Sequence, residues 1–189
     1  MVPEDLRDHP DRRRWNARFA DDPPGFPPHP LAADAMEANP PPGPVLELAA
    51  GRSGSALELA AMGRTVTVVD VSDVALDQLT EEAERRDLGD RVHCVLADAT
   101  RFRPEESYAI VLATRYWDEG AFDVGAAAVS PGGLFGWEAL AAVDGETTRF
   151  RVRHGALGAR LPRGFAILTE RQLTAGHART TRLLARRTH

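Results

Sequence analysis

The sequence predicts an α/β fold in which helices cover both faces of a mostly parallel sheet. From Val45 onward, short apolar runs alternate with helical segments, and such alternation is typical of parallel strands joined by crossover helices. The tail departs from this pattern with two strand-like runs joined by a short turn. At 189 residues the chain is long enough to bury a three-layer core as one domain without disulfides or metal.

The first 44 residues differ in character from the rest of the chain. Prolines are concentrated at 21–30 and 39–44, and these stretches flank a short helical candidate at 31–38. We therefore expect residues 1–44 to be an N-terminal extension laid over the core as a lid, and residues 45–189 to form the main domain.

The elements of the main domain follow from the periodicity of apolar residues. The tail is predicted to form an antiparallel hairpin of 165–173 and 178–185, with its turn at 174–177. A Ser-Pro-Gly-Gly turn at 130–133 should introduce the fifth strand. Strands before the hairpin are expected at 45–49, 65–69, 92–96, 109–113 and 133–139, with helices at 54–62 and from the Ser72 cap to about residue 87.

Composition excludes several classes of function. All 23 basic residues are arginine, so a Walker-type phosphate loop, a Schiff-base enzyme and a Tyr/Lys short-chain dehydrogenase are excluded in their usual forms. The formal charge of −5 argues against a general nucleic-acid binder, and the arginine clusters at 12–14 and at the C-terminus are expected to be solvated ends. No histidine pattern has metal-ligand spacing, so no metal is expected.

No membrane partner is expected either. No apolar stretch approaches the roughly 20 residues of a membrane helix, and the charged start of the sequence lacks the apolar region of a signal peptide. These features predict a cytoplasmic protein. Its oligomeric state has no signature in the sequence.

A candidate ligand site lies after the first strand, because open parallel sheets bind ligands beyond the carboxyl ends of their strands. Gly51 stands in a turn of small residues whose backbone amides could approach a ligand carboxylate. Ser53 stands where the dinucleotide pattern GxGxxG has its second glycine, so an ordinary tight turn is the alternative. Glu47, in an otherwise buried strand, needs a partner such as a ligand ammonium, unless its strand end is exposed or an arginine pairs with it.

Two further acids follow the second and third strands. Asp70 stands 19 positions after Gly51, close to the spacing of ribose-binding acids, and its alternative role is to cap the helix near Ser72. Asp98 stands where an adenine amino group could donate to it, or where it could cap its own loop.

Four features follow one another along the sequence: Glu47, the Gly51 turn, Asp70 and Asp98. In this order they resemble the motifs of class I S-adenosylmethionine-dependent methyltransferases, which have a Rossmann-like seven-stranded sheet with an antiparallel last hairpin. Within that class, the sequence more closely resembles small bacterial proteins of the tellurite-resistance methyltransferase type, which have a Trp-x-x-Arg-Tyr element comparable to residues 15–19 and a fourth strand comparable to 108–116. The resemblance implies S-adenosylmethionine as cofactor. This sequence differs from the family pattern at Ser53, where the second glycine of the turn is usual, and at Phe19, where tyrosine is typical. The implied cofactor contacts are Glu47, Ala49 and Gly51 for the methionine part, Asp70 and Val71 for the ribose, Asp98 and Ala99 for the adenine, and Trp15 and Arg18 from the N-terminal element.

The resemblance also implies methyl transfer to an acceptor at the ends of the fourth and fifth strands. Positioning can supply much of such a rate without a dedicated base. Arg115 and Tyr116 are the candidate catalytic residues, with Trp117 and Glu138 lining the acceptor pocket. The alternative roles are an Arg115–Glu138 ion pair, aromatic packing, and a solvated charge at Glu138.

A small-molecule acceptor is expected, because the Asn/Asp-Pro-Pro-Tyr motif of amino-directed DNA methyltransferases is missing after the fourth strand. Two rival functions share part of the pattern. A non-catalytic module on the same fold could bind a nucleoside-like ligand or a protein, which Ser53 would favour. A nicotinamide-dependent oxidoreductase would share the turn and the acid after the second strand, but not the other features.

Overall fold

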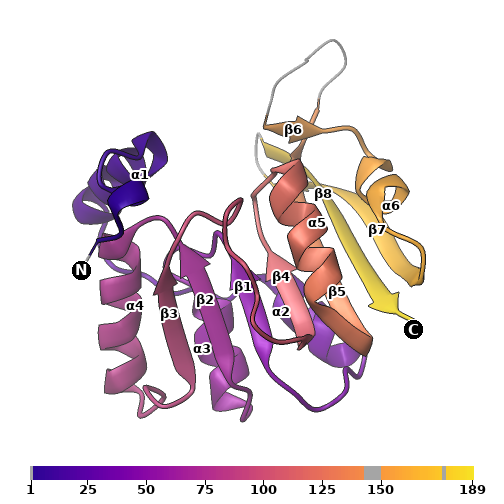
Figure 1. Ribbon diagram of the computed structural model, residues 1–189, viewed down its shortest axis with the longest axis horizontal. Coiled ribbons are helices and arrows are strands. Elements are labelled where there is room, and N and C mark those ends of the chain that lie inside the picture. The colour runs from indigo at the N-terminus through magenta and orange to yellow at the C-terminus, as the bar shows by residue number, and fades with distance from the viewer. Residues whose placement is uncertain (1, 143–149, 176–177) are drawn as a thin grey trace.

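The computed structural model describes residues 2–142, 150–175 and 178–189 (Figure 1). Its strands form one sheet whose main path has the order β3-β2-β1-β4-β5-β8-β7. The strands on this path are β1 (Val45–Leu48), β2 (Val66–Asp70), β3 (Val92–Leu96), β4 (Tyr108–Ala113), β5 (Val129–Ala141), β7 (Phe165–Ala175) and β8 (Ala178–Arg187).

Strands β1 to β5 pair in parallel, whereas β8 runs antiparallel to both β5 and β7. This confirms the predicted mostly parallel sheet and its closing hairpin. A short strand not foreseen from the sequence, β6 (Arg151–Val152), pairs with the end of β5. The predicted hairpin turn includes residues 176–177, which lie outside the described residues.

Helices cover both faces of the sheet, as predicted. On one face, α2 (Pro30–Glu37), α3 (Gly54–Ala61) and α4 (Asp73–Arg85) pack with the side chains that β1, β2 and β4 direct to that side. On the other face, α5 (Glu119–Ala128) and α6 (Ala156–Arg160) bury a second cluster, in which the ring of Phe122 makes edge contacts with the rings of Phe135 and Trp137. These two apolar layers form the core.

The N-terminal segment contains two helices with different roles. Helix α1 (Pro10–Asp21) has no buried residue and lies at the carboxyl-end edge of the sheet, beside α4 (Figure 1). Helix α2 instead buries Leu31, Ala32 and Ala35 completely or almost so. The expectation that the whole of residues 1–44 only overlies the core was therefore wrong for α2, whose apolar face is part of that core.

The expected turn at 130–133 is also wrong, because β5 already begins at Val129. The pairing of β5 with β4 shifts register in this region, and Gly132 has a φ of +77°. A Cβ on Gly133 would come within 2.9 Å of the backbone oxygens of Ser130 and Ala109. The glycines therefore serve an irregular strand, where such residues commonly mark bulges.

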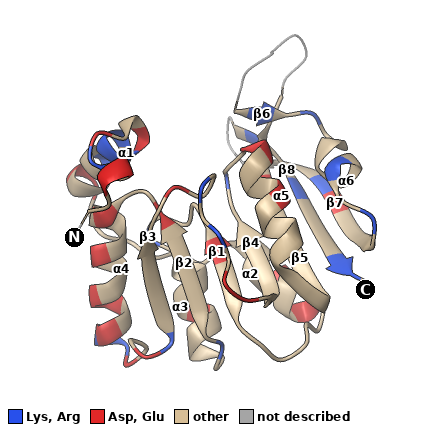
Figure 2. Cartoon of the chain, in the orientation of Figure 1, with Lys and Arg blue, Asp and Glu red and all other residues tan. Residues whose placement is uncertain are grey.

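Figure 2 shows the arginines along β8. Three of them are engaged within the fold, contrary to the expectation that the C-terminal arginines are solvated ends. Arg182 is buried against Glu138, while Arg186 and Arg187 donate to backbone carbonyls of neighbouring segments. Among the N-terminal arginines, Arg12 is bound to Asp73. Within the described ranges, no helix is long and apolar enough to span a bilayer.

Candidate active site

Three carboxylates follow one another along the carboxyl-end edge of the sheet. Glu47 lies in β1, Asp70 ends β2, and Asp98 follows β3 by two positions. Because β1, β2 and β3 are neighbours in the sheet, their ends meet at one edge. The three acids that the sequence singled out are therefore brought to the same region.

The turn after β1 has an unusual backbone. Ala49 and Gly51 have φ values of +49° and +56°, which is the left-handed region that side chains disfavour. A Cβ on Gly51 would stand 2.9 Å from the ring of Phe19 in α1, so glycine is needed both for its conformation and for this close approach. The sequence signal at Gly51 thus has a definite structural cause.

Glu47 is only 2% exposed, and its carboxylate Oε2 accepts a 2.5 Å hydrogen bond from the Ser53 hydroxyl. Burial raises the pKa of Glu47 from its ordinary value of 4.5 to about 7, although the bond from Ser53 acts in the opposite direction. The two alternatives considered for Glu47 are wrong, since it is buried and no arginine within the described residues pairs with it.

Asp70 is tied to the backbone on both sides of the site. One oxygen accepts the amide of Gly51 at 2.8 Å, and the other accepts the amide of Ser72 at 2.8 Å. Burial raises the pKa of Asp70, and these amide bonds act against the rise. Asp70 therefore orders the approach to α4, which the capping alternative anticipated. A carboxylate has about four lone-pair sites, so it can also accept from a ligand donor. Val71, the next residue, is half-buried.

Asp98 faces the N-terminal segment. Its Oδ1 accepts the amide of Thr100 at 2.9 Å, as the loop-capping alternative anticipated, and its Oδ2 lies 3.5 Å from Nε2 of His9. Ala99 is buried in the core. The position of His9 beside this acid was not predicted.

Helix α1 is fastened to the start of α4 by polar contacts. The guanidinium of Arg12 binds Asp73 through two hydrogen bonds of 2.8 Å, and Asn16 donates to the same carboxylate at 2.6 Å. Asn16 also accepts from the hydroxyl of Ser72 at 2.7 Å. Phe19 of the same helix lies over Gly51. Arg12, Asn16 and Phe19 are four and three positions apart in the sequence, which places all three side chains on one face of α1.

The two N-terminal residues singled out from the sequence lie beside that face. Trp15 is half-buried, and its ring stacks on that of Phe19 with 5.8 Å between the ring centroids. The guanidinium of Arg18 lies over the Trp15 ring, 5.3 Å from its centroid. Arg18 is exposed and pairs with Asp22 at 3.6 Å. No hydrogen bond or ion pair of the described chain joins Arg18 to Glu47, Asp70 or Asp98.

Arg115 and Tyr116 follow β4 at the same edge. Arg115 is exposed and has a φ of +55°, a sparsely populated conformation that occurs disproportionately at functional sites. The backbone of Tyr116 donates to the carbonyl of Glu138 at 3.1 Å and accepts from the indole of Trp137 at 2.8 Å. Burial, aided by nearby acids including Asp118, raises the pKa of Tyr116 above its usual range, so its phenol remains a hydrogen-bond donor.

Glu138 is not a solvated charge and does not pair with Arg115, so both structural alternatives involving it were wrong. It is 2% exposed and pairs with Arg182 at 2.7 Å and with His29 at 3.2 Å. The other nitrogen of His29 accepts from the amide of Leu31, so this side chain joins the start of α2 to β5. Burial would raise the pKa of Glu138, but the bonds from His29 and Arg182 lower it below its ordinary value.

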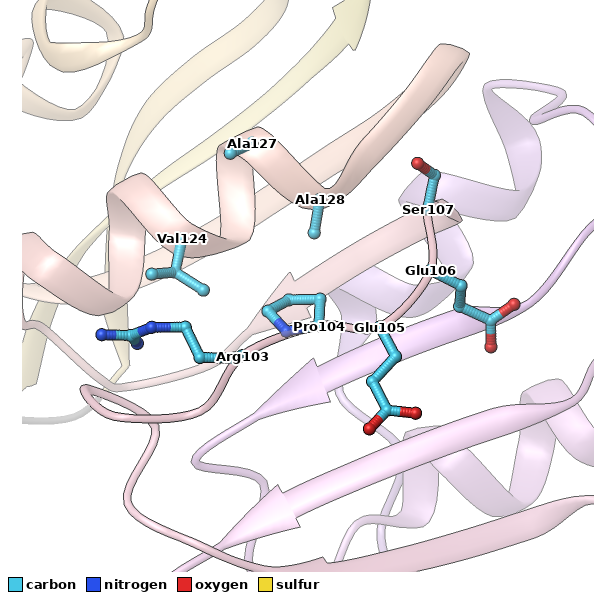
Figure 3. A pocket seen from close by; sticks show the side chains of 8 residues that line it. All are labelled: Arg103, Pro104, Glu105, Glu106, Ser107, Val124, Ala127 and Ala128. Atoms are coloured by element: carbon cyan, nitrogen blue, oxygen red, sulfur yellow. The ribbon is translucent and has the colours of Figure 1, made fainter.

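The edge as a whole offers oxygen acceptors, and their chemistry suits a ligand with an ammonium group, ribose hydroxyls and an adenine amino group. Within the described residues, no group of three or more His, Cys, Asp or Glu could hold a metal ion. A separate open hollow, lined by residues such as Arg103, Pro104 and Val124, lies at the opposite edge, where β4 begins and α5 ends (Figure 3). Its lining does not include Glu47, Asp70 or Asp98.

Comparison with known proteins identifies the domain. Residues 45–133 match the family model described as a methyltransferase domain. The chain carries a class I methyltransferase domain. S-adenosylmethionine is the methyl donor of this class, and it is the cofactor of the domain. The nicotinamide oxidoreductase alternative thereby loses its support. No curated protein sequence matches the chain.

Solved structures share the fold of the methyltransferase domain at low identity. TehB from Haemophilus influenzae has a TM-score of 0.74 at 19% identity, covering 85% of this chain, which spans 62% of TehB. The CcbJ methyltransferase from Streptomyces caelestis has a TM-score of 0.70 at 18% identity, with 92% and 96% covered. The glycopeptide N-methyltransferase MtfA complexed with S-adenosyl-L-methionine has a TM-score of 0.62 at 20% identity, with 82% and 92% covered.

Proposed function

We propose that the methyltransferase domain binds S-adenosylmethionine along the edge formed by β1, β2 and β3 and methylates a small molecule. The observation that carries this proposal is the row of Glu47, Asp70 and Asp98 at the ends of three neighbouring strands. In the proposed arrangement, Glu47 accepts from the ligand ammonium, Asp70 from the ribose hydroxyls, and Asp98 from the adenine amino group. Ala49, Gly51, Val71 and Ala99 contribute through the backbone beside these acids.

Helix α1 supports a second part of the proposal, that the N-terminal segment acts as a lid. Its N-cap His9, and Asn16 and Phe19 on its inner face, each contact an element of the candidate site. Trp15 and Arg18 would act indirectly by stiffening Phe19 and the helix. A closed α1 would exclude water from the reacting atoms, which strengthens electrostatic contacts there.

The acceptor would enter at the end of β4. When bound, the cofactor supplies an electrophilic methyl group on a sulfonium, and the acceptor's nucleophile must approach it in line. Arg115 is free of hydrogen bonds and ion pairs to the described residues, so it is available to orient a small planar or anionic acceptor. Tyr116, held at both its amide and its carbonyl, would pack against the acceptor or the sulfonium.

Two observations support a small acceptor over a polymer. MtfA is described as a glycopeptide N-methyltransferase, and another structure of the same fold as a coclaurine N-methyltransferase, with a TM-score of 0.66 at 14% identity. In addition, the formal charge is −5, and the C-terminal arginines Arg182 and Arg186 are engaged within the fold rather than presented to a polyanion.

Titration calorimetry with S-adenosylhomocysteine, S-adenosylmethionine and NADH tests the cofactor assignment. We expect saturable one-to-one binding of the first two and none of NADH, together with a higher melting temperature, because a ligand selective for the native state stabilises it. Absence of binding at millimolar S-adenosylhomocysteine would overturn the assignment. Binding without methyl transfer to any small amine, thiol, phenol or carboxylate would instead support a non-catalytic binding module.

A further inference from the structure

Ser53 uses its one hydroxyl for two neighbours at once. It donates its proton to Oε2 of Glu47 at 2.5 Å, and its oxygen accepts the backbone amide of Ala56 at 2.9 Å. The second bond makes Ser53 the N-cap of α3. The first bond has no part in capping, and a glycine, which is usual at this position in the proteins that the sequence resembles, could not make it.

The carboxylate that Ser53 contacts has few other sources of support. Its strand neighbours in register are Val68 and Leu112, both apolar and completely buried. Nothing charged in the described residues acts on the pKa of Glu47, which is governed by burial and by the Ser53 bond alone. A desolvated carboxylate in such surroundings favours its neutral form unless donors reach it.

The two oxygens of Glu47 are in different situations. Oε2 is held by Ser53, whereas no hydrogen bond from the described chain reaches Oε1. An ammonium group of a ligand would find an acceptor at Oε1 only if the carboxylate is ionised and held in a fixed rotamer. The Ser53 hydroxyl promotes both conditions, because a donated hydrogen bond stabilises the charged form and fixes its orientation.

We propose that Ser53 is a positioning residue of the cofactor site, whose hydroxyl holds Oε2 of Glu47 so that the ionised carboxylate presents Oε1 to the ligand ammonium. This inference rests on the proposed function. It assigns the serine a role in ligand binding, where the sequence alone presented it as a departure that would weaken the site.

Because Ser53 also caps α3, the test must separate capping from positioning. Replacing an N-cap serine by glycine costs only a few tenths of a kcal/mol of helix stability, whereas alanine costs about 1 kcal/mol. Ser53→Gly and Ser53→Ala therefore differ in the capping loss but share the loss of the Glu47 bond. Ser53→Thr keeps the hydroxyl and serves as the conservative rescue.

The experiment measures S-adenosylhomocysteine affinity by calorimetry from pH 5.5 to 8.5 for the wild type, the three Ser53 variants and Glu47→Gln. In parallel, the carboxyl carbon shift of Glu47 in the ligand-free protein, labelled with carbon-13 glutamate, reports its titration directly. Glu47→Gln, which has no titrating group at this position, corrects for ionisation of histidines and of the ligand.

We expect wild-type affinity to rise with pH and to level off above the Glu47 titration. In Ser53→Gly and Ser53→Ala alike, the Glu47 midpoint should move upward by roughly one pH unit. Because the wild-type pKa of Glu47 is about 7, the ionised fraction at pH 7 would fall from about one half to about one tenth, so binding at pH 7 should be about fivefold weaker. Ser53→Thr should restore the wild-type profile, and Glu47→Gln should bind weakly without this pH dependence.

Three outcomes would overturn the inference: a wild-type profile in Ser53→Gly, an affinity loss confined to Ser53→Ala, or a wild-type affinity that does not change with pH. The first two would leave Ser53 as a cap alone, with the proposed function intact. Failure of the wild type to bind S-adenosylhomocysteine at any pH would overturn the proposed function itself, and the two failures are thus distinguishable.

Discussion

The carboxylate of Asp70 accepts a 2.8 Å hydrogen bond from the backbone amide of Gly51, which joins the end of β2 to the turn after β1. A second bond from the Ser72 amide joins the same carboxylate to the start of α4. Asp70 is therefore a structural tie between the segments that form the candidate site, in addition to its proposed role as a ribose ligand.

Replacing Asp70 with alanine should impair both folding and ligand binding. Two buried amides would lose a charged acceptor, and such bonds contribute about 1.5 to 3 kcal/mol each, so we expect urea denaturation to report a loss of about 3 kcal/mol or more. Calorimetry should show at least a tenfold weaker affinity for S-adenosylhomocysteine in the protein that remains folded. Asp90→Ala, at an exposed position, is the matched control. Full affinity in folded Asp70→Ala would refute the ribose assignment.

The stability of the ligand-free protein should fall as pH rises from about 4.5 to about 7. Burial raises the folded-state pKa of Glu47 to about 7, so its neutral form is favoured in the fold. Such a group contributes stability that is fully present below the unfolded pKa and is lost as pH rises through the folded pKa. The loss should be about 3 kcal/mol, measured by urea denaturation, and Glu47→Gln should abolish it. An unchanged pH profile in Glu47→Gln would show that other groups cause the effect.

The Arg12–Asp73 pair should control how firmly α1 closes over the site. We expect Arg12→Met to release S-adenosylhomocysteine about tenfold faster in stopped-flow measurements, because a bidentate pair that is part-buried would be lost. Arg13→Met is the matched control, since Arg13 pairs with Asp8 on the exposed side. Equal dissociation rates in the two variants would contradict the lid proposal.

Arg115→Met should reduce turnover about 100-fold while leaving S-adenosylhomocysteine affinity unchanged, if Arg115 orients the acceptor. The assay uses any acceptor found by screening for methyl uptake. Arg103→Met, at the hollow on the opposite edge, should leave both quantities unchanged (Figure 3). Undiminished turnover in Arg115→Met would rule out the orienting role.

The buried Glu138 should be a determinant of stability rather than of catalysis. Glu138→Ala would leave Arg182 and His29 without their shared partner, and breaking a buried pair in this way costs about 3 kcal/mol or more. Because the pKa of Glu138 is lowered in the fold, its contribution is present above its unfolded pKa and is lost as pH falls through the folded pKa. Urea denaturation of Glu138→Ala measures this loss of stability, with the exposed Glu37→Ala as the control variant. Equal stability would contradict it.

Strand periodicity was sufficient to predict the sheet, because the strands from β1 to β4 are short apolar runs bounded by turns. Helices α1, α5 and α6 were not predicted. Helix α1 buries none of its residues, so it shows no strong apolar stripe. Helix α5 does carry a sequence signal, the N-cap Asp118, which accepts the amide of Ala121, but its interior contains Gly125, which weakens helix propensity.

The carboxylates of the candidate site were predictable because strand ends of a parallel sheet meet at one edge. Their partners were not. The contacts of His9 with Asp98 and of Asn16 with Ser72 join positions 56 or more residues apart, and the docking of a polar helix has no periodic signature. The second role of Ser53 likewise depends on the rotamer of Glu47, which residue spacing does not encode.

A crystal structure with S-adenosylhomocysteine bound tests the central claim most directly. We predict that Glu47 will contact the ligand ammonium, that Asp70 will accept from the ribose hydroxyls, and that Asp98 will accept from the adenine amino group, with α1 over the ligand. Ligand density away from the ends of β1, β2 and β3, or a ligand whose ammonium and ribose contact none of these three acids, would contradict the account.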